Sequence, residues 1–286
     1  LAAFCSAKGR MQASFIVVRT LHTAEEDRYL LLCRQDLLAQ ILKRLTMFKL
    51  RSQLTLTDVS AEIAVYGLLG EAARQAWQGD MPVLWAHQQQ EQRDLVWLYP
   101  SVGQDTQLPR ALCLQPAGLP APVGASVSAQ DWELSEVRSG VATVSQATWE
   151  AFVPQMINYE SVGGVSFKKG CYPGQEVVAR SQFRGAIKRR GCIAAGVLAD
   201  GAALPQAGQD VFLVPTAGAA DSVRDGECGL IAQVATLPQD GFELIASLQL
   251  HAMEAVSQGL ATLHAGSDTG PELQLLPLPY VLLEDI

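Results

Sequence analysis

The sequence changes character near residue 187. Beyond this position it consists of short apolar segments separated by clusters of Gly, Pro, Asp and Ala, and no segment requires a long helix. Segments of this length and spacing are typical of a small antiparallel barrel or sandwich. The predicted strands are Ile193–Leu198, Asp210–Val214, Glu227–Leu237 and Phe242–Leu250. We therefore predict a C-terminal β-barrel domain over residues 188–286, with a boundary near Gly185–Arg190.

Residues 1–187 mix helical and strand periodicity. A helix is predicted from Asp36, where apolar residues recur at helical spacing as far as Leu45. The Pro-, Gly- and Gln-rich stretch Gln104–Gly124 reads as a loop with only a short strand at Ala111–Leu114. Further strands are predicted over Met11–Arg19, Tyr29–Cys33, Leu54–Val59, Glu62–Leu68, Val83–His87 and Asp94–Tyr99. This order indicates an α+β domain with antiparallel sheet.

Composition excludes several classes of protein. No apolar run approaches the roughly 20 residues of a membrane span, and Leu1–Arg10 lacks the order of a signal peptide. The 6 cysteines form no C-x-x-C pair and the 4 histidines are dispersed, which argues against a disulfide scaffold and against a metal site. We therefore expect a protein of a reducing, cytoplasmic compartment that has no membrane partner.

Charge is unevenly distributed along the chain. The net charge is −8, which disfavours nonspecific binding to nucleic acid by the whole surface. Between Glu160 and Arg190, however, seven Lys and Arg residues stand against two Glu, a net charge of +5 that leaves −13 for the rest. This basic segment is either an ordinary solvated rim or a surface that attracts anions.

The densest chemical signal is the segment Gly163–Glu176. Its four glycines and one proline exclude a regular element and predict a loop, followed by a helix that begins near Gly174. Cys171 would lie just before the start of that helix, with Lys168 and Lys169 upstream. Positive charge and a helix N-terminus both favour a thiolate. Cys171 is therefore the candidate reactive cysteine, although a lone Cys in such a turn is more often a small filler residue.

Trp132 is the second candidate. It lies on a predicted helix that Ser128 or Asp131 caps and that runs to about Arg138. Its ring offers a face on which a flat heterocycle could stack, but plain core packing explains a Trp equally well. The remaining tryptophans, Trp85 among them, are read as core or surface residues. No G-K-[ST] follows the glycine-rich loop and no G-x-G-x-x-G follows a strand, so a phosphate loop and a dinucleotide fold are unsupported.

Residues Lys169–Glu176 read K-G-C-Y-P-G-Q-E, which resembles the signature of the YgfZ-type folate-binding family, within the GcvT aminomethyltransferase-like superfamily. The resemblance extends over essentially the whole chain. Its further points are Lys8–Met11, Pro154–Gln155 with Asn158, Val178–Arg180, Phe183–Gly185 and Pro277–Tyr280. It implies a GcvT-like fold, with ferredoxin-like α+β units around a central cavity and a C-terminal β-barrel. It also implies that the family's first strand and helix precede Leu1.

The resemblance implies a tetrahydrofolate-binding accessory protein for iron–sulfur cluster assembly or repair. Its partners would be assembly proteins or client enzymes, and an effect on tRNA modification would be indirect, without direct nucleic-acid binding. Cys171 would be the reactive thiol, and Lys169 would favour its charged form. Folate-contacting candidates are Trp132, Tyr172, Gln175, Glu176 and Arg138. The basic segment would then attract the polyglutamate tail of folate.

Two departures from the transferase relatives leave alternatives open. Ala13–Ser14 stands where the aminomethyltransferase has its catalytic aspartate, and Arg138 stands near the place of a folate-contacting glutamate. A folate-dependent one-carbon transferase is therefore the second hypothesis, weakened because a carboxylate is missing there. A scaffold that acts only through protein contacts is the third. Whether the protein is an enzyme stays open at this point.

Overall fold

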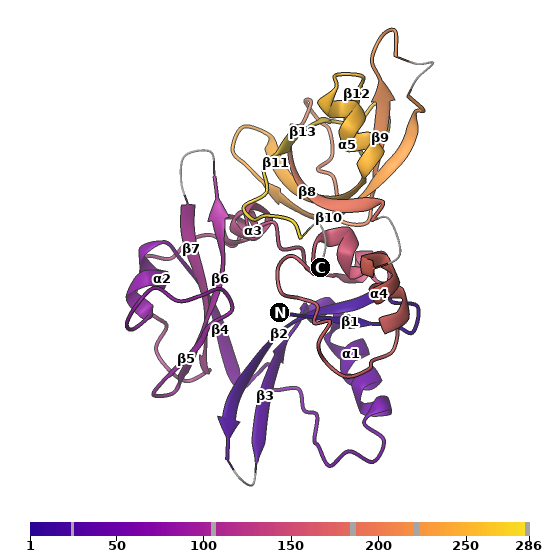
Figure 1. The fold of residues 1–286 in the computed structure, drawn as a ribbon. Helices are drawn as coiled ribbons and strands as arrows, with labels where there is room; N and C mark the ends of the chain where they lie inside the picture. The colour runs from indigo at the N-terminus through magenta and orange to yellow at the C-terminus, as the bar shows by residue number, and fades with distance from the viewer. Residues whose placement is uncertain (24–25, 104–106, 184–186, 220–222, 284–286) are drawn as a thin grey trace.

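The computed structural model describes residues 1–23, 26–103, 107–183, 187–219 and 223–283. It contains two antiparallel sheets, of three and four strands, and a closed six-stranded barrel (Figure 1). The predicted combination of an α+β part with a C-terminal β-barrel is thus confirmed. Arg184 of the predicted basic segment, and Gly185 at the predicted boundary, lie outside the described residues. Among the residues described, no helix has the length and apolarity needed to cross a membrane.

The three-stranded sheet has the order β1-β2-β3. Its strands are β1 (Ala2–Cys5), β2 (Met11–His22) and β3 (Asp27–Leu32), and helix α1 (Gln35–Phe48) follows them. Leu37 and Ile41, one helical turn apart, are the buried residues of α1 and join Phe15 of β2 in a common core. The predicted helix from Asp36 is therefore confirmed, and it covers one side of this sheet.

The four-stranded sheet has the order β4-β7-β6-β5. Its elements are β4 (Ile63–Leu69), α2 (Glu71–Ala76), β5 (His87–Gln90), β6 (Arg93–Val102) and β7 (Gln107–Pro116). Side chains of β6 alternate between two cores, as strand geometry requires. Trp97 packs with Ala73 of α2 on the outer face, whereas Leu98 packs with Val18 of β2 between the two sheets.

The structure corrects three strand predictions. Val83–His87, predicted as a strand, is irregular with a turn at Trp85, whose φ is +65°, and strand β5 begins only at His87. The stretch read as a loop with a short strand holds the ten-residue strand β7, which lies between β4 and β6. Pro109 within β7 lacks an N–H, and the pairing of β6 with β7 shifts register between Leu98 and Ser101, opposite this proline. Leu54–Val59, predicted as a strand, forms no regular element.

A long connection leads from the second sheet to the barrel. It contains α3 (Ala129–Arg138), the 3-10 turns Gln146–Thr148 and Pro154–Ile157, and α4 (Gln175–Phe183). Ser128 caps α3 as predicted: its Oγ accepts from Asp131 N–H, and the Asp131 carboxylate accepts from Ser128 N–H. The cap fixes the start of α3 and therefore which of its side chains face the sheets.

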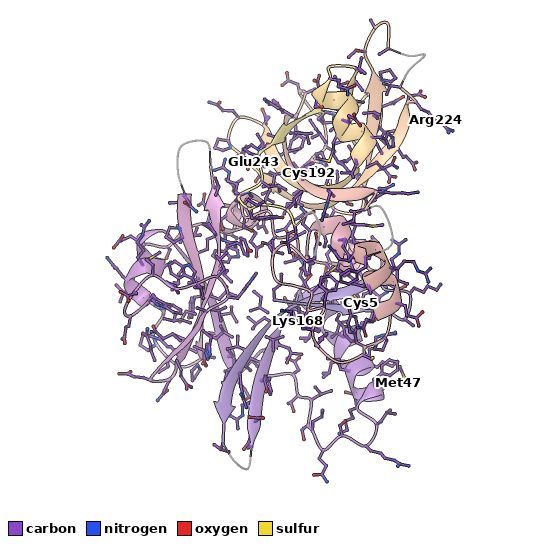
Figure 2. The ribbon with its side chains drawn as sticks, in the orientation of Figure 1. Cys5, Met47, Lys168, Cys192, Arg224 and Glu243 are labelled. Atoms are coloured by element: carbon purple, nitrogen blue, oxygen red, sulfur yellow. The ribbon has the colours of Figure 1, made fainter. Side chains whose placement is uncertain are left out.

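The barrel has the strand order β10-β11-β8-β13-β12-β9, with β9 returning to pair with β10. Its elements are β8 (Arg189–Val197), β9 (Asp210–Pro215), β10 (Gly226–Thr236), β11 (Gly241–Gln249), α5 (Leu250–Ser257), β12 (Ala261–Ala265) and β13 (Glu272–Leu276). The four predicted strands are confirmed. Helix α5, β12 and β13 were not predicted. Cys192 and Phe242 belong to the apolar filling of the barrel (Figure 2).

One hydrophobic cluster joins the barrel to the rest of the molecule. Val137 of α3 and Ala232 of β10 belong to the same buried core as Met11 of β2. Buried Arg190 of β8 forms an ion pair with Glu160, and its Nη2 donates to the carbonyl oxygen of Leu283 at 3.0 Å. Arg190 is thus an internal structural residue and does not belong to an exposed basic surface, contrary to the sequence-based count.

Candidate functional site

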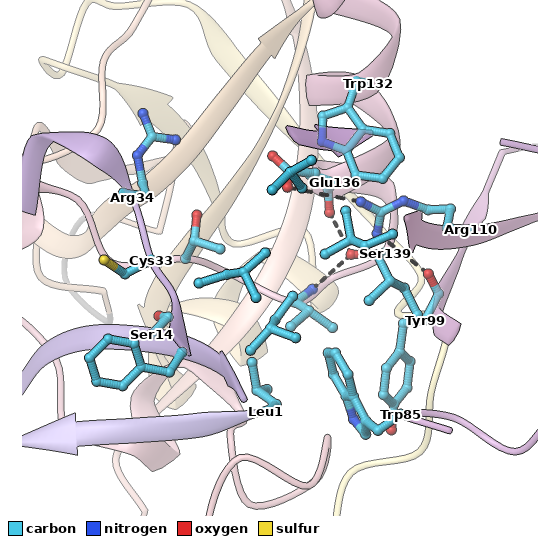
Figure 3. Close-up of a pocket in the computed structure, with 18 residues that line it drawn as sticks. Leu1, Ser14, Cys33, Arg34, Trp85, Tyr99, Arg110, Trp132, Glu136 and Ser139 are labelled. Atoms are coloured by element: carbon cyan, nitrogen blue, oxygen red, sulfur yellow. Dashed lines mark hydrogen bonds and ion pairs between the residues drawn. The ribbon is translucent and has the colours of Figure 1, made fainter. Parts of the chain in front are cut away.

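A cavity of about 250 Å³ lies between the two sheets and under α3 (Figure 3). Strands β2 and β3 supply one wall, β4, β6 and β7 supply the other, and α3 with the segment after it closes the space. Its lining residues are Leu1, Ser14, Phe15, Ile16, Leu32, Cys33, Arg34, Val65, Trp85, Leu98, Tyr99, Arg110, Leu112, Trp132, Glu136, Ser139, Val141 and Thr143. A mainly apolar space with a few converging polar groups is the usual form of a ligand site.

Arg110 is the main cation of this cavity. It projects from β7, is only 4% exposed, and stacks on Trp132 with its guanidinium carbon 4.6 Å from the ring centroid. One Nη donates to the Tyr99 carbonyl oxygen at 3.4 Å, but Nε has no hydrogen-bond partner among the described residues. Burial lowers the pKa of Arg110 to about 10, partly offset by Glu136. A buried, incompletely paired guanidinium beside a cavity suits a ligand that presents an acceptor.

Glu136 supplies the opposite charge. Its Oε1 lies 4.0 Å from Nη2 of Arg110, a distance that allows attraction without a hydrogen bond. Its Oε2 accepts a hydrogen bond from Nε2 of Gln233 at 3.3 Å. Burial raises the pKa of Glu136, and the nearby charges of Arg110 and Arg34 oppose that rise. The cavity therefore holds one hydrogen-bond donor group and one acceptor group side by side against an aromatic ring.

Trp132 provides the aromatic ring, as one of the two sequence interpretations proposed. The indole lies directly on β4 at Gly67, where an added Cβ would stand 2.4 Å from Cε3 of Trp132. Glycine is therefore required at this position for the ring to lie against the sheet. Trp85, read from sequence as a core or surface residue, also lines the cavity. Its Nε1 donates to the Val162 carbonyl oxygen at 2.8 Å.

Ser14, at the position where the sequence resemblance implies a missing carboxylate, lies on the cavity wall. Its Oγ accepts from the backbone N–H of Val144 at 2.9 Å and lies 2.6 Å from the Tyr159 hydroxyl. That hydroxyl lies 2.7 Å from the carbonyl oxygen of Ala142, and Tyr159 is fully buried. Ser14 is thus fixed in a hydrogen-bonded network within the wall. The described carboxylate of the cavity comes from α3, as Glu136.

Arg138, a predicted folate contact, does not line the cavity. Its Nε and Nη2 donate to the two carboxylate oxygens of Glu243 on β11, at 2.8 and 2.7 Å. Residues four apart share a helix face, so Glu136 lies beside Trp132 while Arg138 turns toward the barrel. Glu136 was not predicted from the sequence, although its i, i+4 spacing from Trp132 was a feature that could have indicated it. Arg110 gave no such signal, because its strand was read largely as a loop.

Cys171 lies in the loop that precedes α4 and is the exposed member of the six unpaired cysteines. Cys33 is half-buried at the cavity wall, and the other four are buried. Burial raises the pKa of Cys5 to about 11 and that of Cys192 to about 12. The sequence interpretation had singled out Cys171 because the others lie in apolar or strand surroundings, and the structure agrees on accessibility.

The loop around Cys171 is held at defined points. Gly174, with φ +84°, packs so closely on the turn between β1 and β2 that an added Cβ would clash with the Ser6 carbonyl oxygen. Gln175 Oε1 accepts from the backbone N–H of Tyr172 at 3.3 Å, and Lys169 Nζ lies 4.5 Å from the centre of the Tyr172 ring. The glycine and glutamine of the motif therefore order the loop.

The predicted site residues separate into two groups. Lys169, Tyr172, Gln175 and Glu176 gather in the loop and helix around Cys171, and none of them lines the cavity. Glu176 is exposed on the first turn of α4. Trp132 alone of the predicted folate contacts lies at the cavity, where Arg110 and Glu136 join it. The structure thus presents a partly open cavity and a separate exposed thiol.

A comparison with models of known protein families finds no match to this chain. The chemistry of the cavity and of the Cys171 loop therefore carries the functional argument.

Proposed function

We propose that the protein binds a reduced folate in the cavity between the two sheets and serves iron–sulfur cluster assembly or repair through Cys171. The observation that carries the proposal is the grouping of Trp132, Arg110 and Glu136 on one side of the cavity. The arrangement of antiparallel sheets around a cavity, followed by a barrel, is consistent with the GcvT-like fold that the sequence resemblance implies, and we include that assignment in the proposal.

The cavity residues fit the folate ring system. The ring is flat and carries N–H groups beside a carbonyl oxygen, which match an acceptor carboxylate and a donor guanidinium. Trp132 supplies an aromatic wall, Glu136 accepts from ring N–H groups, and the guanidinium of Arg110 donates to the ring carbonyl oxygen. A bound tetrahydrofolate supplies a carrier of one-carbon units. The protein's own contribution is to orient the ring and exclude water from it.

The second part of the proposal concerns Cys171. An exposed thiol in a fixed loop can exchange with a partner's thiols or hold a metal-bound group in passing, which a buried thiol cannot. The partner would be an iron–sulfur assembly protein or a client enzyme, and the cluster would be cargo. A reducing cytoplasmic compartment suits six unpaired cysteines.

Two measurements test this function. Titration calorimetry with tetrahydrofolate should give saturable heat, and Trp132→Ala and Glu136→Gln should each weaken binding, whereas Trp149→Ala, outside the cavity, should not. Complementation of cells that lack iron–sulfur enzyme activity should fail with Cys171→Ala and succeed with Cys33→Ala. The absence of saturable heat would refute the folate role, and full activity of Cys171→Ala would refute the thiol role.

One observation favours the one-carbon transferase as a second candidate. Glu136 is a cavity carboxylate whose pKa is raised by burial, a property of many general acids and bases. It lies on α3 and not at Ser14, so a transfer reaction would use a different wall of the cavity from that of the transferase relatives. Formaldehyde or aminomethyl transfer by the purified protein that disappears in Glu136→Gln would establish this activity. Its absence in the wild type leaves the accessory role.

A further inference from the structure

Gln233 of β10 links the barrel to the polar groups of the cavity wall. Gln233 is 8% exposed and bridges Thr143, which lines the cavity, to Glu136 on α3. Its Oε1 lies 3.4 Å from the backbone nitrogen and 3.2 Å from the hydroxyl of Thr143. Its Nε2 lies 3.3 Å from Oε2 of Glu136. The barrel is therefore part of the cavity's hydrogen-bond network.

A β-bulge directs this side chain out of the barrel. The pairing of β10 with β11 shifts register between Ile231 and Gln233. Ile231 and Val234 pack inside the barrel, whereas Ala232 and Ala235 belong to the core shared with α3. Regular alternation from Ile231 would send residue 233 inward as well. The extra residue in the bulge instead turns Gln233 toward Glu136, as bulges beside functional sites often do.

Hydrogen-bond chemistry fixes which end of the amide faces Glu136. The backbone N–H of Thr143 can only donate, so the amide oxygen must face Thr143. The amide NH₂ group must then face Glu136, where it can only donate. Oε2 of Glu136 is therefore held as an acceptor, and this donation favours the ionised carboxylate over the protonated acid. Oε1 lies on the side of Arg110.

We infer that Gln233 is a positioning residue, which holds Glu136 as an ionised acceptor so that the cavity selects ligands presenting N–H donors. This inference rests on the proposed folate function and adds to it a determinant in the barrel. Gln233 itself does not line the cavity. It acts through Glu136, whose charge it stabilises against burial.

The pH dependence follows from the groups around Glu136. Arg110 of β7 and Arg34, just before α1, face it with positive charge and oppose the rise of its pKa that burial causes, as do the hydrogen bonds from Trp132 and Gln233. The other titratable groups of the wall are Cys33, Tyr99 and the amino group of Leu1. A ligand that donates to the carboxylate binds more weakly as pH falls through the pKa of Glu136. Without the Gln233 donor that pKa rises further, so the weakening begins at a higher pH.

The experiment measures tetrahydrofolate affinity by calorimetry across pH for wild type, Gln233→Leu, Gln233→Met and Gln233→Glu. Gln233→Glu also brings a second negative charge against Glu136, so its effect is judged against the uncharged variants Gln233→Leu and Gln233→Met, of which the methionine keeps the length of the side chain and guards against a folding defect in the leucine variant. Loss of one hydrogen bond to the charged carboxylate predicts binding weaker by up to roughly tenfold at pH values below the midpoint. It also predicts an upward displacement of the pH midpoint by about one unit. The control, Glu243→Gln, alters the neighbouring contact of the barrel with α3 and should leave the midpoint unchanged.

A second readout does not depend on folate. In carbon-13 NMR, the Glu136 carboxyl group, assigned with Glu136→Gln, should titrate at a higher pH in the uncharged variant Gln233→Met than in wild type. If wild type binds no tetrahydrofolate, the proposed function fails while this titration still tests Gln233. An unchanged titration of Glu136, or unchanged affinity and midpoint in both uncharged Gln233 variants, would overturn the inference.

Discussion

Replacing Arg110 with Met and replacing Arg190 with Met should have different effects on the free energy of unfolding, although both arginines are buried. Arg110 is buried beside the cavity with an unpaired Nε, and burial lowers its pKa from the ordinary value to about 10. At pH 7 the guanidinium is charged in the folded and unfolded chains alike, so the folded state bears the whole cost of burying that charge. The lowered pKa corresponds to roughly 3 kcal/mol. Arg190, in contrast, has the carboxylate of Glu160 and a backbone carbonyl as partners.

Arg110→Met removes this cost but also loses the contact with Trp132 and the weak attraction to Glu136. Glu136 keeps its bond from Gln233 and is 26% exposed, so it is not left as an isolated buried charge. We expect the free energy of unfolding to be unchanged or raised by up to about 2 kcal/mol. Arg190→Met should lower it by about 3–5 kcal/mol, because Glu160 then loses its partner inside the protein.

Urea denaturation followed by circular dichroism at pH 7 gives both free energies, and calorimetry gives the tetrahydrofolate affinity. Arg110→Met should bind at least roughly tenfold more weakly. If a variant gains stability and loses affinity for the ligand, the replaced side chain serves binding and not stability. If Arg110→Met loses as much stability as Arg190→Met, Arg110 is a structural ion-pair residue and this reasoning is wrong.

Two more predictions follow from the packing and the cysteines. Gly67→Ala should displace the Trp132 ring, lower the free energy of unfolding by about 1–3 kcal/mol and weaken folate binding. The control Gly118→Ala has no heavy atom within 4 Å of the added Cβ and should change neither quantity. Equal effects of the two substitutions in thermal denaturation would contradict this. Iodoacetamide should modify Cys171 of the native protein well before Cys192, because Cys192 is buried and burial raises its pKa to about 12. Mass spectrometry that shows early labelling of Cys192 would disprove that order.

Sequence patterns were sufficient to predict the elements that follow simple rules of strand spacing and helix capping. Four of the six barrel strands were predicted because short apolar segments alternate with turn residues, and α3 because Ser128 or Asp131 marks its start. The central strand β7 was largely missed, because Pro109 and the surrounding Gln and Gly residues are typical of loops. Its register shift shows how the sheet accommodates that proline, and this adjustment depends on the partner strand, which local sequence does not specify.

The candidate site was predictable only where it is local in sequence. The loop at Cys171 is built by consecutive residues, so its exposure and ordered geometry could be expected from glycines and capping rules. The cavity instead combines Arg110 of β7, Trp132 and Glu136 of α3, and indirectly Gln233 of the barrel. These positions meet only after three separate parts of the chain have packed. Local sequence patterns do not predict contacts between residues this far apart in the chain.

The pairing of β8 with β13, which closes the barrel, affects how the chain folds during synthesis. Strand β8 (Arg189–Val197) is completed by pairing with β13 (Glu272–Leu276), the last strand along the chain. Contacts between such distant segments form late and carry a loop-closure cost, so β8 and β12 expose unpaired edges until β13 emerges from the ribosome. Gln233 acquires its final surroundings only when that ring of strands is complete. The hydrogen-bond network around Glu136 is therefore completed only after β13 has joined the barrel.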